Sequence, residues 1–136
     1  MEKIFNSLGQ SLFSELNDGE DLILSFYGEN SQFVRFNNAS VRQTGLVDDA
    51  DIGLKFIANG RTCGGGFTVS GNFDTDLNRG RAEIDRMRSE SNQIPEDPFL
   101  VMPENSGSSH ETKKANGLAF DDAVDAILPA VSGVDF

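Results

Sequence analysis

Residues 51–60 read Asp51-Ile52-Gly53-Leu54-Lys55-Phe56-Ile57-Ala58-Asn59-Gly60 and combine a strand pattern with a turn signal. Apolar and polar side chains alternate through the first seven positions, which places Ile52, Leu54 and Phe56 on one face of a half-buried strand. Asn59-Gly60 is a strong hairpin signal, because a type I′ turn needs positive φ at both central residues and Asn and Gly adopt it at least cost. The chain is therefore expected to return antiparallel over residues 61–69.

A long helix is predicted after this hairpin, from a cap at Asp74 to the neighbourhood of Ile94. Aspartate is among the preferred N-cap residues. Pro95 ends the pattern, because the residue before a proline disfavours α geometry. The apolar contacts of this helix recur at helical spacing and are Leu77, Ile84 and Met87.

One further helix and three further strands are predicted before the hairpin. The helix covers residues 2–16, and its apolar stripe is Ile4, Phe5, Leu8, Leu12, Phe13 and Leu16. The strands are expected at residues 21–27, 32–36 and 40–47, with turns at residues 28–30, 37–39 and 48–49. The fold class is α+β: an antiparallel meander of about five strands, with the N-terminal helix and the long following helix packed on one face, plus a short C-terminal helix.

The segments after the long helix differ in character from the first part of the chain. Residues 1–103 are interpreted as an N-terminal α+β domain in which Phe99, Leu100, Val101 and Met102 dock against the body. Residues 104–119, rich in Ser, Gly, Asn and charge, are interpreted as a flexible loop. Residues 120–136 are interpreted as a short helix, starting near Asp121-Asp122 and limited by Pro129, followed by the start of a truncated segment. The apolar positions of that helix are Phe120, Val124, Ile127 and Leu128.

The composition bounds the class of protein. A chain of 136 residues is long enough for a core, and its eleven phenylalanines predict that the core is filled by phenylalanine. The formal net charge of −11 repels phosphate backbones, so no direct nucleic-acid partner is expected. The N-terminus has no signal-peptide pattern and no apolar run reaches transmembrane length, so we expect a cytoplasmic protein without membrane contact.

Two residues are of types that serve in catalysis or metal binding, His110 and Cys63. His110-Glu111 begins like a His-Glu-x-x-His zinc motif, but no second histidine follows at the required spacing, so a solvated loop histidine is favoured. Cys63 has no neighbouring base in the sequence and is interpreted as a buried structural thiol. One histidine and one cysteine do not complete a zinc site. No catalytic, cofactor-binding or metal-ligating residue is therefore assigned to this chain.

Two other patterns allow a structural and a functional interpretation. Gly64-Gly65-Gly66 lies inside a predicted strand, where it indicates a bulge or a place where another backbone comes close, and not a phosphate loop. The long helix carries a basic patch interleaved with acidic residues, for which a solvated face with intrahelical ion pairs is preferred over docking to an acidic partner. The patch consists of Arg79, Arg81, Arg86 and Arg88.

Several of these segments together resemble the N-terminal domain of the TldD/PmbA (TldE) family. The resemblance begins with Gln32-Phe33-Val34-Arg35-Phe36-Asn37-Asn38-Ala39-Ser40-Val41-Arg42-Gln43-Thr44-Gly45. It continues in Ile52-Gly53-Leu54-Lys55-Phe56-Ile57-Ala58-Asn59-Gly60-Arg61, through residues 74–94, in Pro95-Glu96-Asp97-Pro98, and in residues 121–127. It therefore covers most of the chain.

The resemblance implies a function that the residues alone do not. Members of this family are described as putative modulators of DNA gyrase and as zinc metallopeptidases that act on peptides. Their zinc-binding His-Glu-x-x-x-His helix lies downstream of the similar region, so the expectation is a noncatalytic, truncated N-terminal domain. The implied partners are a family member, in a homo- or hetero-dimer, and an extended peptide in a cleft. The alternative is an autonomous acidic protein-interaction module, for example a gyrase-binding DNA mimic.

Overall fold

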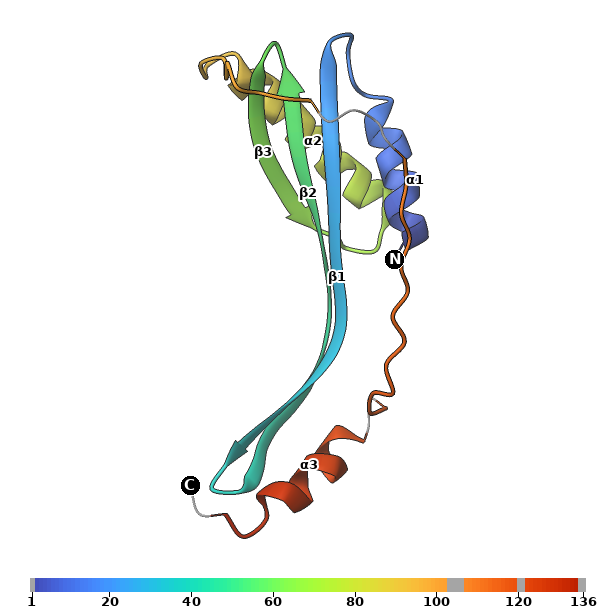
Figure 1. The fold of residues 1–136 in the computed structure, drawn as a ribbon, viewed down its shortest axis with the longest axis vertical. Coiled ribbons are helices and arrows are strands. Elements are labelled where there is room, and N and C mark those ends of the chain that lie inside the picture. Colours follow the sequence, from blue (N-terminus) through green and yellow to red (C-terminus); the bar gives the residue numbers. More distant parts are fainter. Residues whose placement is uncertain (1, 103–106, 120–121, 135–136) are drawn as a thin grey trace. The chain divides into compact units, whose positions relative to one another are not determined.

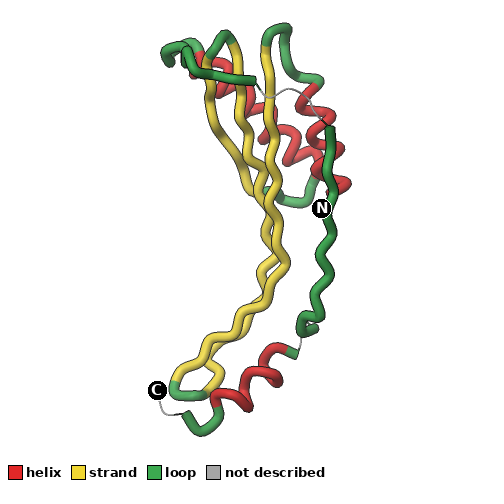
Figure 2. Tube along the Cα trace, viewed as in Figure 1, coloured by secondary structure: helices red, strands yellow, loops and turns green. Residues whose placement is uncertain are grey.

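The computed structural model describes residues 2–102, 107–119 and 122–134 and has an α+β architecture. Three antiparallel strands form one sheet in the order β1-β2-β3, and helices follow and precede them in the chain (Figures 1 and 2). In chain order the elements are α1 (Glu2–Phe13), β1 (Glu20–Asn37), β2 (Ser40–Ala58), β3 (Arg61–Thr68), α2 (Phe73–Ser91) and α3 (Ala123–Val131). The predicted α+β class is confirmed.

The chain divides into two compact units. Unit 1 comprises Met1–Gly28 and Asp49–Pro103, and unit 2 comprises Glu29–Asp48 and Glu104–Phe136. The long strands β1 and β2 each contribute one part to unit 1 and one part to unit 2.

The core of unit 1 lies between the sheet and the two helices α1 and α2. The predicted inward face of β2 is confirmed, because Ile52, Leu54 and Phe56 are all buried. The expectation of a phenylalanine-filled core is wrong: among the described phenylalanines only Phe56 is fully buried, and the other buried side chains are mainly aliphatic. The core cluster is Leu8, Leu12, Leu22, Ile52, Leu54, Phe56, Ala58, Cys63, Leu77, Ile84 and Met87.

The β2–β3 hairpin has the predicted turn. Asn59 has φ 50° and Gly60 has φ 69°, as a type I′ turn requires. The two strands then pair one residue to one residue, from Ala58 opposite Arg61 to Asp51 opposite Thr68. This unbroken register keeps Ile52, Leu54 and Phe56 of β2 on the side of the helices, because a slip by one position would exchange the two faces.

The five-strand meander is not confirmed, because two of the predicted turns are continuous strand. Residues 28–30 lie inside β1 and residues 48–49 lie inside β2. A tight hairpin turn needs positive φ at its central residues. No described residue in either segment has positive φ, whereas Asn38 and Ala39 in the confirmed turn have φ 49° and 55°. Glycine, asparagine and aspartate thus occur here within strands instead of ending them.

Helix α2 begins earlier than the sequence indicates. The N-cap is Asn72, not Asp74, and its side chain accepts a hydrogen bond of 3.0 Å from the backbone nitrogen of Thr75. Asp74 instead lies in the first helical turn, where its negative charge is favourable beside the helix dipole. The helix ends at Ser91, before Pro95 as expected.

Helices α1 and α2 approach each other closely at a glycine. A Cβ atom built on Gly80 would lie 2.7 Å from Cδ2 of Leu12, closer than real carbon atoms come. The stripe predicted for α1 is confirmed at Leu8 and Leu12, which are fully buried, but Ile4 and Phe13 are exposed. The helix is also shorter than predicted, because it ends at Phe13.

The segment after α2 returns to the β2–β3 turn, but its apolar residues do not dock as predicted. The backbone nitrogen of Asp97 donates to the Gly60 carbonyl at 2.8 Å, and Nε of Arg61 donates to the Ile94 carbonyl at 2.9 Å. In contrast, Phe99 is 87% exposed and Val101 is 83% exposed. The polar residues near Pro95 therefore fix this segment, and the expected apolar docking is wrong for both of these side chains.

Unit 2 contains the end of the β1–β2 hairpin and helix α3. Within the hairpin, Nη1 of Arg35 donates to Oε1 of Gln43 at 3.1 Å. Residues 107–119 form neither helix nor strand. Pro129 lies inside α3 and does not limit it, because the helix continues to Val131 with a hydrogen bond from Ser132 N to Leu128 O. Phe120 and Asp121, predicted at the start of this helix, lie outside the described residues.

Among the described residues, no helix combines the length and the apolar character that a membrane span requires.

Candidate functional site

The outer edge of β3 is the candidate site in unit 1. β3 is the last strand of the described sheet, with β2 on one side only (Figure 1). In an antiparallel ladder, hydrogen-bonded pairs of residues alternate with pairs that are not hydrogen-bonded. Ala58 and Arg61 flank the two-residue turn and form the first hydrogen-bonded pair, and the bond from Val69 N to Ala50 O, eight residues further along, fits this alternation. Odd-numbered residues of β3 therefore exchange hydrogen bonds with β2. The backbone groups that point away from β2 belong to Thr62, Gly64, Gly66 and Thr68.

The three glycines of β3 meet different surroundings. Gly66 lies against β2, where an added Cβ would be 2.7 Å from the Ile52 carbonyl oxygen, so the close backbone approach proposed for this triplet is found inside the sheet. The alternative of a bulge is wrong, because the register with β2 is unbroken. Gly64 has open space where its Cβ would be. The edge is thus least crowded at Gly64.

Two arginines of α2 reach this edge and bind its carbonyl groups. Nη2 of Arg86 donates to the Gly64 carbonyl at 3.2 Å, and Nη1 of Arg79 donates to the Thr68 carbonyl at 2.8 Å. Both carbonyls belong to the outward set, which agrees with the alternation along β3. Two of the four outward carbonyls of β3 thus accept a hydrogen bond from an arginine side chain of α2. Charged side chains across an edge strand are a known protection against uncontrolled strand pairing.

Carboxylates of α2 hold Arg86 in this position. Its Nη2 lies 2.7 Å from Oε2 of Glu83, and its Nη1 binds Glu90 one helical turn further along. The hydrogen bonds with Glu83 and then Glu90 raise the pKa of the Arg86 guanidinium, so this side chain stays charged. Gly65 leaves room for the pair, since a Cβ there would lie 2.3 Å from Oε2 of Glu83.

Asp76 anchors the other end of the edge. Its side chain is fully buried and accepts hydrogen bonds of 2.8 Å from the backbone nitrogen and the hydroxyl of Ser70 and of 3.1 Å from the backbone nitrogen of Gly71. Oδ1 of Asp76 also lies 3.7 Å from Nη1 of Arg79. This carboxylate therefore fixes the loop between β3 and α2 and orients Arg79 toward the strand.

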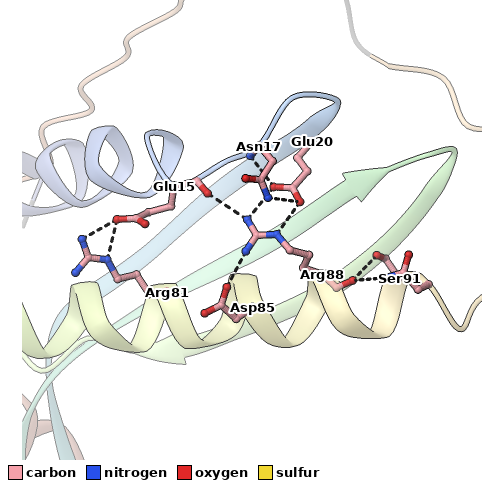
Figure 3. Close-up of polar contacts among 8 residues, drawn as sticks. Glu15, Asn17, Glu20, Arg81, Asp85, Arg88 and Ser91 are labelled. Carbon is pink, nitrogen blue, oxygen red and sulfur yellow. Dashed lines mark hydrogen bonds and ion pairs between the residues drawn. The ribbon is translucent and has the colours of Figure 1, made fainter.

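The other two arginines of α2 serve a structural network on the opposite side of the helix (Figure 3). Arg88 binds Glu20 through Nε at 2.7 Å and through Nη2 at 2.8 Å, and it donates to the Glu15 carbonyl. Arg81 binds the Glu15 carboxylate. The hydrogen bond from Arg88, followed by bonds from Asn17, lowers the pKa of Glu20 to about 2. These contacts join α2 to the segment between α1 and β1.

The predicted basic patch is thus divided between two sites. All four arginines are paired with carboxylates, which agrees with the preferred interpretation of an ion-paired face. The sequence suggested pairing within the helix, which holds for Arg79, Arg86 and Arg88. It did not show that Arg79 and Arg86 reach β3. The available signal was their spacing of seven residues, which places both on one side of a helix.

The predicted histidine and cysteine belong to different units. Cys63 is buried in the core of unit 1, as expected of a structural thiol. His110 is exposed in unit 2, where its Nε2 lies 3.1 Å from Oγ1 of Thr112. In the described ranges, no three His, Cys, Asp or Glu side chains are grouped in a way that could hold a metal ion.

A scan against protein-family models, a search of curated proteins and a search of solved structures each gave no match.

Proposed function

We propose that this chain is the noncatalytic N-terminal α+β domain of a TldD/PmbA-like protein, where it contributes to dimer assembly and to one wall of a cleft for an extended peptide. The observation that supports the peptide role is the outer edge of β3. Backbone groups of Thr62, Gly64, Gly66 and Thr68 point outward there, and the strand is not paired on this side in the described sheet.

An added strand is the ligand that such an edge fits. An extended peptide can pair with an exposed strand through backbone hydrogen bonds, while its alternate side chains lie on the two faces of the sheet. Open space at Gly64 allows another chain to approach. In this proposal β3 binds the peptide and supplies no catalytic group.

Zinc and the peptidase reaction belong, in this proposal, to a catalytic domain outside these 136 residues. The residues that the structure describes do not fit a zinc site. Its one cysteine is buried in the core of unit 1, and its one histidine lies in unit 2 beside a threonine.

A proline substitution at the edge tests the peptide role. Gly64→Pro removes an outward N–H without removing a hydrogen bond to β2, so the sheet should persist. We expect the variant to lose about tenfold or more in affinity for fluorescein-labelled eight-residue peptides of extended sequence, measured by anisotropy. Gly64→Ala keeps the N–H and fits the open space, so it should recover most of that affinity. Parent-like binding by Gly64→Pro, or no binding by the parent, would overturn the peptide role.

The alternative function, an autonomous acidic interaction module, makes a different prediction. It would bind its partner through carboxylates, so Gly64→Pro would leave partner binding intact. Reading the gene beyond the codon for residue 136 separates the two proposals further. A following His-Glu-x-x-x-His segment supports the TldD/PmbA-like assignment, and an immediate stop codon supports the alternative.

A further inference from the structure

The α2 side of the β3 edge is rich in hydrogen-bond acceptors and carboxylates. The Gly64 and Thr68 carbonyls point outward, and Glu83 and Glu90 of α2 bind Arg86, which donates to the Gly64 carbonyl. Both carbonyls and both carboxylates are occupied by guanidinium groups of this chain. The edge therefore already has the geometry that binds a cationic side chain.

A strand added at this edge would direct alternate side chains toward the same groups. Side chains of an added strand that lie beside Cys63, Gly65 and Phe67 project to the face covered by α2, because neighbouring residues in a sheet share a face. On that face the space above Gly65 is occupied by Oε2 of Glu83 and Nη2 of Arg86. A peptide side chain that lies beside Gly65 would therefore meet the ion pair of Glu83 and Arg86.

The charge of the peptide side chains determines which peptide binds most tightly at this edge. Pairing through the Gly64 carbonyl displaces the Nη2 group of Arg86 from it, which disturbs the ion pairs with Glu83 and Glu90. A lysine or arginine of the peptide can replace the displaced guanidinium beside these carboxylates. A glutamate there would add a third negative charge. The net charge of −11 also attracts cationic peptides over longer distances.

We infer that the β3 edge selects extended peptides that carry lysine or arginine on the side facing α2, and that Arg86 occupies the cation position when no peptide is bound. This inference rests on the proposed peptide role of β3 and adds the class of substrate. Arg86 acts as an internal competitor in this arrangement. Its removal should strengthen the binding of a basic peptide.

The test compares three acetylated, amidated eight-residue peptides in which valine alternates with lysine, glutamine or glutamate. Their affinities for the full chain are measured by anisotropy at one fixed salt concentration, because ion pairing depends on salt. We expect the lysine peptide to bind about tenfold more tightly than the glutamate peptide. Arg86→Ala should raise the affinity for the lysine peptide by about threefold or more, within the energy of one charged hydrogen bond.

Two charge-matched double variants separate a local site from general attraction. Glu83→Gln with Glu90→Gln should abolish the preference for lysine over glutamate. Glu15→Gln with Asp85→Asn removes the same amount of charge near Arg81 and Arg88. This control variant should keep the preference for the lysine peptide over the glutamate peptide. Urea unfolding of each variant checks that the fold persists.

The possible outcomes distinguish this inference from the proposed function. Equal binding of the three peptides, still sensitive to Gly64→Pro, would overturn the lysine and arginine selectivity and leave the peptide role of β3 intact. An equal loss of preference in both double variants would also overturn it, since general attraction would then suffice. Binding that is insensitive to Gly64→Pro would overturn the proposed peptide role itself.

Discussion

Nε of Arg88 lies 2.7 Å from Oε1 of Glu20, and this ion pair joins the last turns of α2 to the first residue of β1 across 68 positions of sequence. The Glu20 side chain is only 10% exposed, and its second oxygen accepts from Nη2 of the same guanidinium. Two parallel hydrogen bonds of this kind are stronger and more specific than a surface ion pair. Glu20 therefore couples the helix to the sheet.

Glu20→Gln should make the stability of the protein less dependent on pH. Because the folded pKa of Glu20 is lowered from 4.5 to about 2, its contribution is fully present above about pH 4.5 and is lost as the pH falls toward about 2. At pH 7 the variant should be about 1–2 kcal/mol less stable, after allowance for solvent screening. Urea unfolding at pH 7 and pH 3 measures the difference, which should shrink at the lower pH. Asp21→Asn, at the exposed neighbouring position, should not show this pattern.

Phe56→Ala should cost about 3–5 kcal/mol, because the side chain is fully buried in the core. His110→Ala should change the free energy of unfolding by less than about 0.5 kcal/mol, because the residue is exposed and its Nε2 lies beside the hydroxyl of Thr112, two residues away. Denaturant midpoints of the two variants provide the comparison. Equal midpoints would show that Phe56 is not part of the core.

Gly60→Val should destabilise the β2–β3 hairpin by about 1–2 kcal/mol. Gly60 has φ 69°, a conformation that a β-branched residue adopts only with strain. The turn should nevertheless form, because the register of β2 is also fixed by three buried apolar residues. A variant that unfolds at the same urea concentration as the parent would contradict this account of the turn.

Ala39→Gly should have the opposite effect at the other hairpin turn. Ala39 has φ 55°, and glycine removes the left-handed penalty of about 1–2 kcal/mol. The greater freedom of glycine in the unfolded chain offsets part of this gain, so we expect a net stabilisation of about 0.5–1 kcal/mol. Thermal unfolding measures it. A lower melting temperature than that of the parent would argue against a strained alanine.

Gly80→Ala should be destabilising although alanine favours helices. The new methyl group would contact Leu12, and overpacking of this kind costs about 1–3 kcal/mol against about 1 kcal/mol gained from helix propensity. A double-mutant cycle with Leu12→Ala tests the cause. In that background the added methyl should become neutral or stabilising, because its steric partner is gone. If the destabilisation by Gly80→Ala were the same with and without Leu12→Ala, a clash with Leu12 would not be its cause.

Local pattern was sufficient to predict the α+β class, the inward face of β2 and the Asn59-Gly60 turn. All three depend on neighbours in sequence. The number of strands was not predictable in this way, because glycine and aspartate, which stand at positions 28 and 48, favour turns over strands. Only pairing with a long partner strand keeps Gly28 and Asp48 extended. The core composition was also misjudged, because counting phenylalanines does not show which of them face the sheet.

The candidate site depends on contacts between elements, which explains why the sequence predicted so little of it. For Gly64-Gly65-Gly66 the sequence predicts a bulge or a close backbone approach, and only the close approach is found, at Gly66. The contacts of Arg79 and Arg86 with β3 are not predicted by the sequence. Their positions on α2 follow from helical spacing, whereas the placement of that helix along β3 follows from packing in the core. No local pattern encodes that placement.

Asp97 lies outside any helix or strand, yet its backbone N–H donates a hydrogen bond to the Gly60 carbonyl in the β2–β3 turn. The rate of hydrogen exchange at this amide should therefore depend on the opening of the hairpin. Arg61 supports the same closure through the Ile94 carbonyl and the Glu96 carboxylate. Deuterium should therefore enter the Asp97 amide only when the β2–β3 turn opens, so its exchange rate should follow that of the hairpin amides and not that of its neighbours in the chain. One slowly exchanging amide thus reports on the cooperative opening of the hairpin.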